Sequence, residues 1–226
     1  MPVFTFQTDQ GPVSIAISKL IVAGWTGRNA AAVQHHIEEL AELGVPAPSS
    51  VPLYYQLGPE LLTQAPVITA LGPATSGEVE PLIVADADGA LWLGLASDHT
   101  DRALETISVA KSKQACPKPI AQTLWRFDSD SANLDDLILS AHILEQGKAG
   151  WTQYQTGTLA AIKPLAELLS ALPGGRLAPG AALLCGTLPA LGGIRTATDF
   201  RMALQDPVSG RTITHQYQIA TLPIIS

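Results

Sequence analysis

Cysteine is scarce in this sequence. Two cysteines occur among 226 residues, Cys116 and Cys185, and neither belongs to a Cys-x-x-Cys pair. Disulfide frameworks and thiolate zinc sites need more cysteines at closer spacing, so the sequence argues against both. We therefore expect two buried, reduced thiols and a cytoplasmic protein.

Long hydrophobic runs are also missing. No stretch approaches the roughly 18 consecutive apolar residues of a membrane-spanning helix. The most apolar window, 177–194, is interrupted by prolines and glycines. The opening residues, MPVFTFQTDQG, contain no basic segment followed by an apolar run. We therefore expect neither a membrane span nor a signal peptide.

Positive charge is in short supply. The sequence has 13 Lys and Arg against 20 Asp and Glu, which gives a net charge of −7. Nucleic acids and anionic membranes bind clusters of Lys and Arg, so we expect neither as a partner. The sequence also lacks the glycine patterns of phosphate-binding loops and the Gly-x-Ser-x-Gly elbow of serine hydrolases.

The composition is that of a protein with an ordinary core, because 46% of residues are hydrophobic and 15% are charged. The length suits one large domain, which we place at residues 1–226. The segments with helical character are 29–43, 101–110 and 158–172. The segments that indicate short strands are 2–7, 12–23, most of 51–127 and 181–226. Strands and helices do not alternate regularly, so we predict an α+β, mainly β fold rather than a doubly wound parallel sheet.

Three carboxylates are predicted to meet on one β-hairpin. Glu78 and Glu80 are two residues apart in a strand-like run, so their side chains lie on the same face. Residues 86–89, Asp-Ala-Asp-Gly, are typical of a tight turn. A turn centred there places Glu78 opposite Ser97 and brings Asp98 beside both glutamates.

This cluster indicates a metal site. Three neighbouring carboxylates repel one another unless a cation lies between them. Ligation by oxygen alone favours Mg²⁺, Mn²⁺ or Ca²⁺ over Zn²⁺. The alternative is a solvated hairpin face whose acidic side chains point outward.

The order of these residues resembles the fumarylacetoacetate hydrolase superfamily. In that superfamily a Glu-x-Glu strand is followed by an Asn-Asp-x-x-x-Arg-Asp-x-Gln element. Here Glu-Val-Glu at 78–80 is followed by Ser-Asp-His-Thr-Asp-Arg-Ala-Leu-Glu at 97–105. Asp98 matches the metal aspartate and Arg102 the arginine. Glu105 stands where the family usually has Gln, so an anion replaces an amide near the substrate.

Three further stretches agree in order with the same superfamily. His36 and Glu39 keep the His-x-x-Glu spacing of its N-terminal segment, although the Asn-Tyr pair of that segment is missing. Gln155 lies in a stretch that resembles the glutamine-containing substrate loop. Gly186 and Thr187 begin Gly-Thr-Leu-Pro, which resembles the family's Gly-Thr-Pro with a leucine inserted.

The resemblance implies a mixed β-roll or sandwich with a few peripheral helices, assembled as a homodimer. It implies that Glu78, Glu80 and Asp98 hold Mg²⁺ or Mn²⁺. The metal would bind the oxo and carboxylate oxygens of a small 2-oxo or 1,3-diketo acid. The residues that the resemblance places at the substrate are Arg102, Glu105, Gln155, Gly186 and Thr187.

The catalytic groups implied by the resemblance are a lysine and a histidine. Lys113 would lie beside the metal-bound oxygen, with Lys118 as the alternative. His36 would activate water, oriented by Glu39, which lies three residues further along the same helix. His35 competes for this role, because it also reaches the acidic side chains of the helix.

The activity that this site predicts is hydrolysis of a carbon–carbon bond in an acylpyruvate-like or fumarylpyruvate-like acid. A decarboxylase, hydratase or isomerase of 2-oxo acids would use the same metal without a hydrolytic water. A third possibility is a non-catalytic protein that binds a small carboxylate. The departures at Glu105, at Leu188 and at the missing Asn-Tyr pair are the features that agree with this third possibility, while hydrolysis remains the predicted activity.

Overall fold

The computed structural model describes residues 1–42, 47–128 and 133–225, except the side chains of residues 36, 39, 40 and 42. Two mixed sheets form most of the molecule. The six-stranded sheet has the order β12-β9-β8-β15-β3-β4, with strands Trp125–Arg126, Leu91–Ser97, Val79–Ala85, Ala181–Leu184, Lys19–Gly24 and Leu53–Leu57. The five-stranded sheet has the order β14-β13-β16-β17-β6, with strands Thr152–Thr158, Ile138–Leu144, Asp199–Gln205, Thr212–Leu222 and Val67–Leu71.

Short pairs of strands and short helices complete the described part of the chain. The paired strands are β1 (Val3–Thr8) with β2 (Gly11–Ala16), β5 (Leu62–Thr63) with β11 (Lys118–Pro119), and β7 (Thr75–Ser76) with β10 (Thr100–Asp101). The α-helices are α1 (Ala30–Glu42), α2 (Arg102–Glu105), α3 (Val109–Gln114) and α4 (Leu165–Ser170). The 3₁₀ turns are η1 (Pro59–Leu61), η2 (Leu134–Asp136) and η3 (Leu159–Ala161). The predicted α+β, mainly β class is confirmed.

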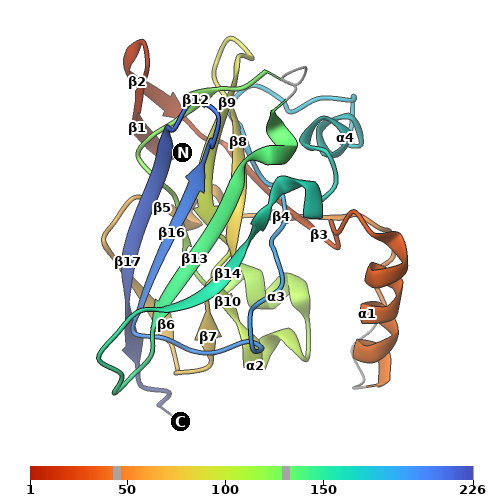
Figure 1. Cartoon of the computed structure of the whole chain (residues 1–226), viewed down its shortest axis with the longest axis vertical. Helices are drawn as coiled ribbons and strands as arrows, with labels where there is room; N and C mark the ends of the chain where they lie inside the picture. The colour runs from red at the N-terminus through yellow and green to blue at the C-terminus, as the bar shows by residue number, and fades with distance from the viewer. Residues whose placement is uncertain (43–46, 129–132, 226) are drawn as a thin grey trace.

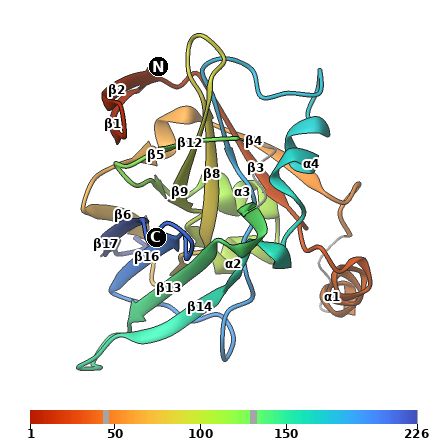
Figure 2. The same cartoon turned by 45° about the horizontal axis from the view of Figure 1, so that its top comes forward.

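The two sheets lie face to face, as Figure 1 shows, with the five-stranded sheet in front of β8 and β9. Helices α2 and α3 lie near β7 and β10, at one end of the sheets. Helix α1 stands at the edge of the molecule in both views (Figures 1 and 2). Among the described residues, no helix has both the length and the apolar character that crossing a bilayer requires.

Strand β8 is buried on both faces and joins two hydrophobic clusters. Val79 and Ile83 contribute to the larger cluster, which fills the space between the two sheets. Leu82 and Val84 belong to the smaller cluster on the opposite face, together with Phe6 of the β1–β2 hairpin. This division follows the two-residue alternation of a strand. Both faces of the strand that carries Glu80 are therefore covered.

The predicted strand at 12–23 is wrong in its extent. The chain leaves β2 at Ala16 and enters β3 at Lys19. Ser18 lies between them, where its backbone amide donates a hydrogen bond of 2.8 Å to the carbonyl of Gly180. This contact directs the chain from the outer hairpin into the six-stranded sheet. The turn between β1 and β2 lies at residues 9–10.

The predicted helix at 101–110 is two helices. The Asp101 side chain caps α2 by accepting a hydrogen bond of 3.0 Å from the amide of Leu104. Ser108 caps α3 in the same way, at 3.4 Å from the amide of Lys111. A residue that caps a helix has non-helical backbone angles, so Ser108 interrupts the run and starts a second helix.

The predicted helix at 158–172 is also shorter, since α4 begins only at Leu165. Pro164 disfavours helical angles at the residue before it, so the chain forms η3 first and the helix starts after the proline.

The predicted start of the first helix is confirmed. The Asn29 side-chain oxygen accepts a hydrogen bond of 3.1 Å from the amide of Ala32, and α1 begins at Ala30. The predicted end of this helix, at residue 43, lies outside the described residues.

Candidate metal centre

The hairpin of β8 and β9 forms as predicted, but its register differs by one residue. Val79 pairs with Ser97. The amide of Asp98 donates a hydrogen bond of 2.9 Å to the carbonyl of Glu78. Glu78 therefore lies opposite Asp98, and the predicted pairing of Glu78 with Ser97 is wrong.

The cause of the shift is the loop at the hairpin's tip. The Asp86 carboxylate accepts hydrogen bonds from the amides of Asp88, at 3.1 Å, and Ala90, at 2.8 Å. This widens the turn by one residue and moves every partner of the second strand.

The register brings three carboxylates together. One oxygen from each of Glu78, Glu80 and Asp98 can be chosen so that all three lie within 4.8 Å of one another. Glu80 and Asp98 are 2% and 0% exposed, whereas Glu78 is partly exposed. The cluster is therefore open to solvent on the side of Glu78, and we call this side its open edge.

Two lysines compensate the buried charge of Asp98. The Lys113 ammonium forms an ion pair with one oxygen of Asp98 and lies 3.9 Å from Glu78. The Lys118 ammonium lies 3.1 Å from the other oxygen of Asp98. Lys118 is fully buried and also donates to the carbonyl oxygens of His99 and Lys113. The sequence left the choice between these lysines open, and the structure places both at the cluster.

The environment drives the pKa values of the two buried carboxyls apart. Burial raises the pKa of Glu80 well above its ordinary value, and the neighbouring Asp98 raises it further. Burial also acts to raise the pKa of Asp98, but Lys113 and Lys118 outweigh it and lower that pKa to about 2. Without a cation, the ionised form is therefore stabilised at Asp98 and disfavoured at Glu80.

The donor set fits a hard divalent ion. The ligands of an octahedral Mg²⁺ lie about 3 to 4.2 Å apart and those of Ca²⁺ up to about 5 Å apart. The 4.8 Å span of the three oxygens is close to these distances. All three donors are carboxylates, which Mg²⁺, Mn²⁺ and Ca²⁺ prefer over the nitrogen and sulfur ligands typical of zinc. Glu78, Glu80 and Asp98 could therefore hold such an ion.

Arg102 and Glu105 lie at the open edge of the cluster. Arg102 Nη2 lies 2.9 Å from Glu78 Oε1, and Nη1 donates a hydrogen bond of 2.8 Å to Glu105 Oε2. Arg102 Nε donates to Ser76 Oγ at 2.7 Å. Burial acts to lower the pKa of the Arg102 guanidinium, but Glu78 and Glu105 outweigh it and raise that pKa.

Gly186 and Thr187 are brought to β8. The amide of Gly186 donates a hydrogen bond of 2.7 Å to Oε2 of Glu80. Thr187 Oγ1 donates to the carbonyl of Val79 at 2.8 Å. Gly186 has φ +97° and a Cβ there would lie 1.7 Å from Oγ1 of Thr26, so this position requires glycine.

Gln155 is fully engaged with the chain. Its side-chain oxygen accepts a hydrogen bond of 3.0 Å from the amide of Val79. Its side-chain nitrogen donates to Thr187 Oγ1 and to the carbonyl of Leu188, at 2.7 and 2.6 Å. Gln155 is 1% exposed and links the five-stranded sheet to β8. It therefore stabilises the strand that carries Glu80.

The predicted histidine–carboxylate pair lies on α1. The backbone of His36 and Glu39 belongs to this helix, but their side chains lie outside the described residues. The side chain of the competing His35 is exposed. The pairing of His36 with Glu39 stays a prediction.

A family model described as "Protein of unknown function (DUF2848)" matches residues 23–217. The chain belongs to this family. The match includes every residue assigned above to the candidate metal centre. No curated protein matches the sequence.

Solved structures resemble this DUF2848-family chain over nearly its whole length. A candidate fumarylpyruvate hydrolase from Burkholderia cenocepacia is 14% identical, with a TM-score of 0.61 over 99% of this chain and 97% of that one. A 2-keto-3-deoxyarabinonate dehydratase is 14% identical, with a TM-score of 0.65 over 93% and 75%. A fumarylacetoacetate hydrolase from Exiguobacterium antarcticum is 13% identical, with a TM-score of 0.60 over 92% and 76%. The predicted fumarylacetoacetate hydrolase-like fold is confirmed.

Sequence reasoning missed a buried polar network beside Asp98. The two ring nitrogens of His99 lie 3.1 Å from Tyr217 Oη and 3.0 Å from Thr75 Oγ1. Tyr217 Oη also lies 2.8 Å from Ser97 Oγ. Both neighbours of Asp98 along the chain are thus tied to β17. The sequence placed His99 next to the metal aspartate, but no signal marked Tyr217.

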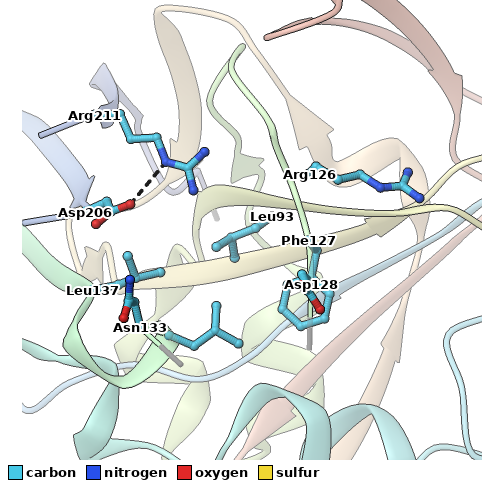
Figure 3. A pocket seen from close by; sticks show the side chains of 9 residues that line it. Leu93, Arg126, Phe127, Asp128, Asn133, Leu137, Asp206 and Arg211 are labelled. Carbon is cyan, nitrogen blue, oxygen red and sulfur yellow. Dashed lines mark hydrogen bonds and ion pairs between the residues drawn. The ribbon is translucent and has the colours of Figure 1, made fainter. Parts of the chain in front are cut away.

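A cavity lies apart from the carboxylate cluster in this DUF2848-family structure. Figure 3 shows a cavity of about 200 Å³, lined by residues that include Leu93, Phe127 and Leu137. Arg126 and Arg211 also line it, and Arg211 lies 3.3 Å from Asp206. The guanidinium of Arg211 lies 4.2 Å from the centre of the Trp125 ring. None of the three clustered carboxylates lines it, so we assign it no part in the metal centre.

Proposed function

We propose that this DUF2848-family protein is a divalent-metal-dependent hydrolase that cleaves a carbon–carbon bond in a small 1,3-diketo or 2-oxo acid. The observation that carries the proposal is the buried carboxylate cluster of Glu78, Glu80 and Asp98, flanked by the cations Lys113 and Arg102. A chelating oxo acid needs this combination of a metal and nearby positive charge.

The ion, when bound, supplies Lewis-acid stabilisation of the enolate that is released when the carbon–carbon bond breaks. The chain supplies the rest of the positive charge. The Lys113 ammonium pairs with Asp98 and lies 3.9 Å from the partly exposed Glu78, so we assign to it the donation of a hydrogen bond to an oxygen bound at this edge. Lys118 is fully buried and pairs with the other oxygen of Asp98, so we assign it a structural role.

Hydrolysis also needs a base that activates water, and we assign this role to His36 with Glu39. The buried His99 is unsuited to it. Both of its ring nitrogens have hydrogen-bond partners, and burial, with the charges of Lys118 and Arg102, lowers its pKa to about 3. A base near neutral pH needs an accessible nitrogen with a pKa close to 7.

A decarboxylase, hydratase or isomerase of 2-oxo acids is the second candidate. It is supported by the two cations beside the cluster, because they stabilise an enolate without any water-activating base. A 2-keto-3-deoxy-D-arabinonate dehydratase complexed with magnesium has a TM-score of 0.63 to this chain.

The direct test is turnover of acylpyruvates and simple 2-oxo acids by chelator-treated protein resupplied with Mn²⁺. We expect two carboxylic acid products, with the rate abolished in Lys113→Met and in His36→Ala but retained in His35→Ala. Unchanged turnover in His36→Ala, with a decarboxylated or dehydrated product, would instead support the second candidate. No turnover of any such acid would contradict both and favour a carboxylate-binding protein.

A further inference from the structure

The guanidinium of Arg102 is engaged by this chain on all three of its nitrogens. Nε donates to Ser76 Oγ at 2.7 Å and Nη1 to Glu105 at 2.8 Å, whereas Nη2 forms an ion pair with Glu78 at 2.9 Å that lacks the geometry of a hydrogen bond. The Arg102 side chain is only 13% exposed, against 27% for Glu105. Glu105 is thus the more accessible of the two.

The formal charges of the carboxylates and cations in and around the cluster nearly cancel. The negative groups of the cluster are Glu78, Glu80, Asp98 and Glu105, and the positive groups are Arg102, Lys113 and Lys118. With all of them ionised, the cluster has one excess negative charge. A divalent ion changes this to one excess positive charge. Because most of these side chains are buried, solvent and salt screen the excess only weakly.

We propose that Glu105 determines specificity, and that it makes this site select oxo acids with a single carboxylate over those with a second one. The inference rests on the proposed function, because it concerns ligands of the metal-loaded site. An acid with one carboxylate neutralises the single excess positive charge.

Among the described side chains, a second carboxylate has no comparable partner at this edge. It would bring an uncompensated negative charge to a partly buried site, close to the Glu105 carboxylate. The cation best placed to receive it, Arg102, already carries two carboxylates and a hydroxyl group. Like-charge contacts of this kind are a common means of rejecting the wrong ligand.

Glu105→Gln tests this role with little change of shape. Glutamine keeps the length of the side chain and can still accept a hydrogen bond from Arg102, but it removes the negative charge. The probes are 2-oxopentanoate and 2-oxoglutarate, which have the same number of carbons and differ in the distal carboxylate. Dissociation constants are measured by calorimetry on Mn²⁺-loaded protein. Glu167→Gln is the control, since Glu167 lies exposed on α4 and pairs with Lys163, which precedes that helix.

We expect wild type and Glu167→Gln to bind 2-oxopentanoate more tightly than 2-oxoglutarate. In Glu105→Gln the ratio of the two dissociation constants should shift about tenfold or more towards 2-oxoglutarate. A wild type that prefers the dicarboxylate overturns the proposal even where the variant does not fold. An unchanged ratio in a folded, Mn²⁺-binding variant overturns it as well. Loss of Mn²⁺ binding by wild type is a different result, because it contradicts the metal centre itself.

Discussion

The amide of Gly186 points at the carboxylate of Glu80, 2.7 Å from its Oε2. Through this hydrogen bond the loop after β15 reaches the carboxylate cluster. It exists only because Gly186 adopts φ +97° and approaches Thr26 more closely than a side chain permits. The loop geometry and the metal site are therefore coupled through one glycine.

Gly186→Ala should destabilise the protein by roughly 2–4 kcal/mol, because it combines a strained φ with a clash against Thr26. Gly192→Ala is the matched control. Gly192 has φ +75° and nothing within 4 Å of its Cβ position, so only the strain of about 1–2 kcal/mol applies. Urea unfolding monitored by fluorescence measures both. Equal losses of unfolding free energy in the two variants would show that the close approach to Thr26 does not contribute to the destabilisation.

Lys118→Met should cost about 3–5 kcal/mol of stability, because it removes a buried cation from Asp98. The carbonyl oxygens of His99 and Lys113 also lose their donor. Lys111→Met is the control, since Lys111 is exposed on α3, and it should change stability by less than about 0.5 kcal/mol. Thermal or urea unfolding of apo protein distinguishes them. A Lys118→Met variant as stable as the control would contradict the role assigned to the ion pair.

His99 should make stability depend on pH. Its pKa is lowered to about 3 in the folded protein, against about 6.5 in an unfolded chain. Below pH 6.5 the unfolded chain takes up a proton that the folded protein refuses. The free energy of unfolding therefore falls with decreasing pH, by up to about 1.4 kcal/mol per pH unit, until the folded pKa is reached.

The comparison that isolates this effect is wild type against His99→Gln. Glutamine retains hydrogen-bonding groups towards Thr75 and Tyr217 but does not titrate. Urea unfolding between about pH 4 and 7, with chelator present, should give a steeper decline for wild type. The raised pKa of Glu80 acts in the opposite direction, but it is common to both proteins. Parallel curves would contradict a neutral, buried His99.

Binding of a metal ion to this protein should release protons. The pKa of Glu80 is raised by burial and by Asp98, and a carboxylate must be ionised to bind a divalent ion. Mn²⁺ binding should therefore release up to one proton per site, and more at about pH 6 than at about pH 8. Calorimetry in buffers of different ionisation enthalpy measures this number. Binding without proton release at every pH would show that Glu80 is already ionised in the apo protein.

Local patterns in the sequence predicted the hairpin and the cluster. The spacing of Glu78 and Glu80 places both on one face, and the turn residues at 86–89 identify the hairpin. The exact register was wrong because it depends on how the Asp86 side chain binds the amides of its own loop. A one-residue difference of this kind follows from side-chain geometry that a residue pattern does not specify.

Contacts between distant segments were the part that the sequence did not predict. Tyr217 lies more than a hundred residues from His99, and nothing near it marks it as a partner of the Asp98 loop. Gln155 was expected at the substrate, whereas its amide is engaged with Val79, Thr187 and Leu188. The two lysines at Asp98 are a further case, because α3 and β11 bring both to one carboxylate.

The central claim is that Glu78, Glu80 and Asp98 hold one divalent ion, and Mn²⁺ titration calorimetry on chelator-stripped protein tests it most directly. Wild type and the surface control Glu167→Gln should bind about one ion per chain. Glu80→Gln, which keeps the shape of the side chain but removes its charge, should bind none in the same range. Absence of binding to wild type, or equal binding to Glu80→Gln, would contradict the account.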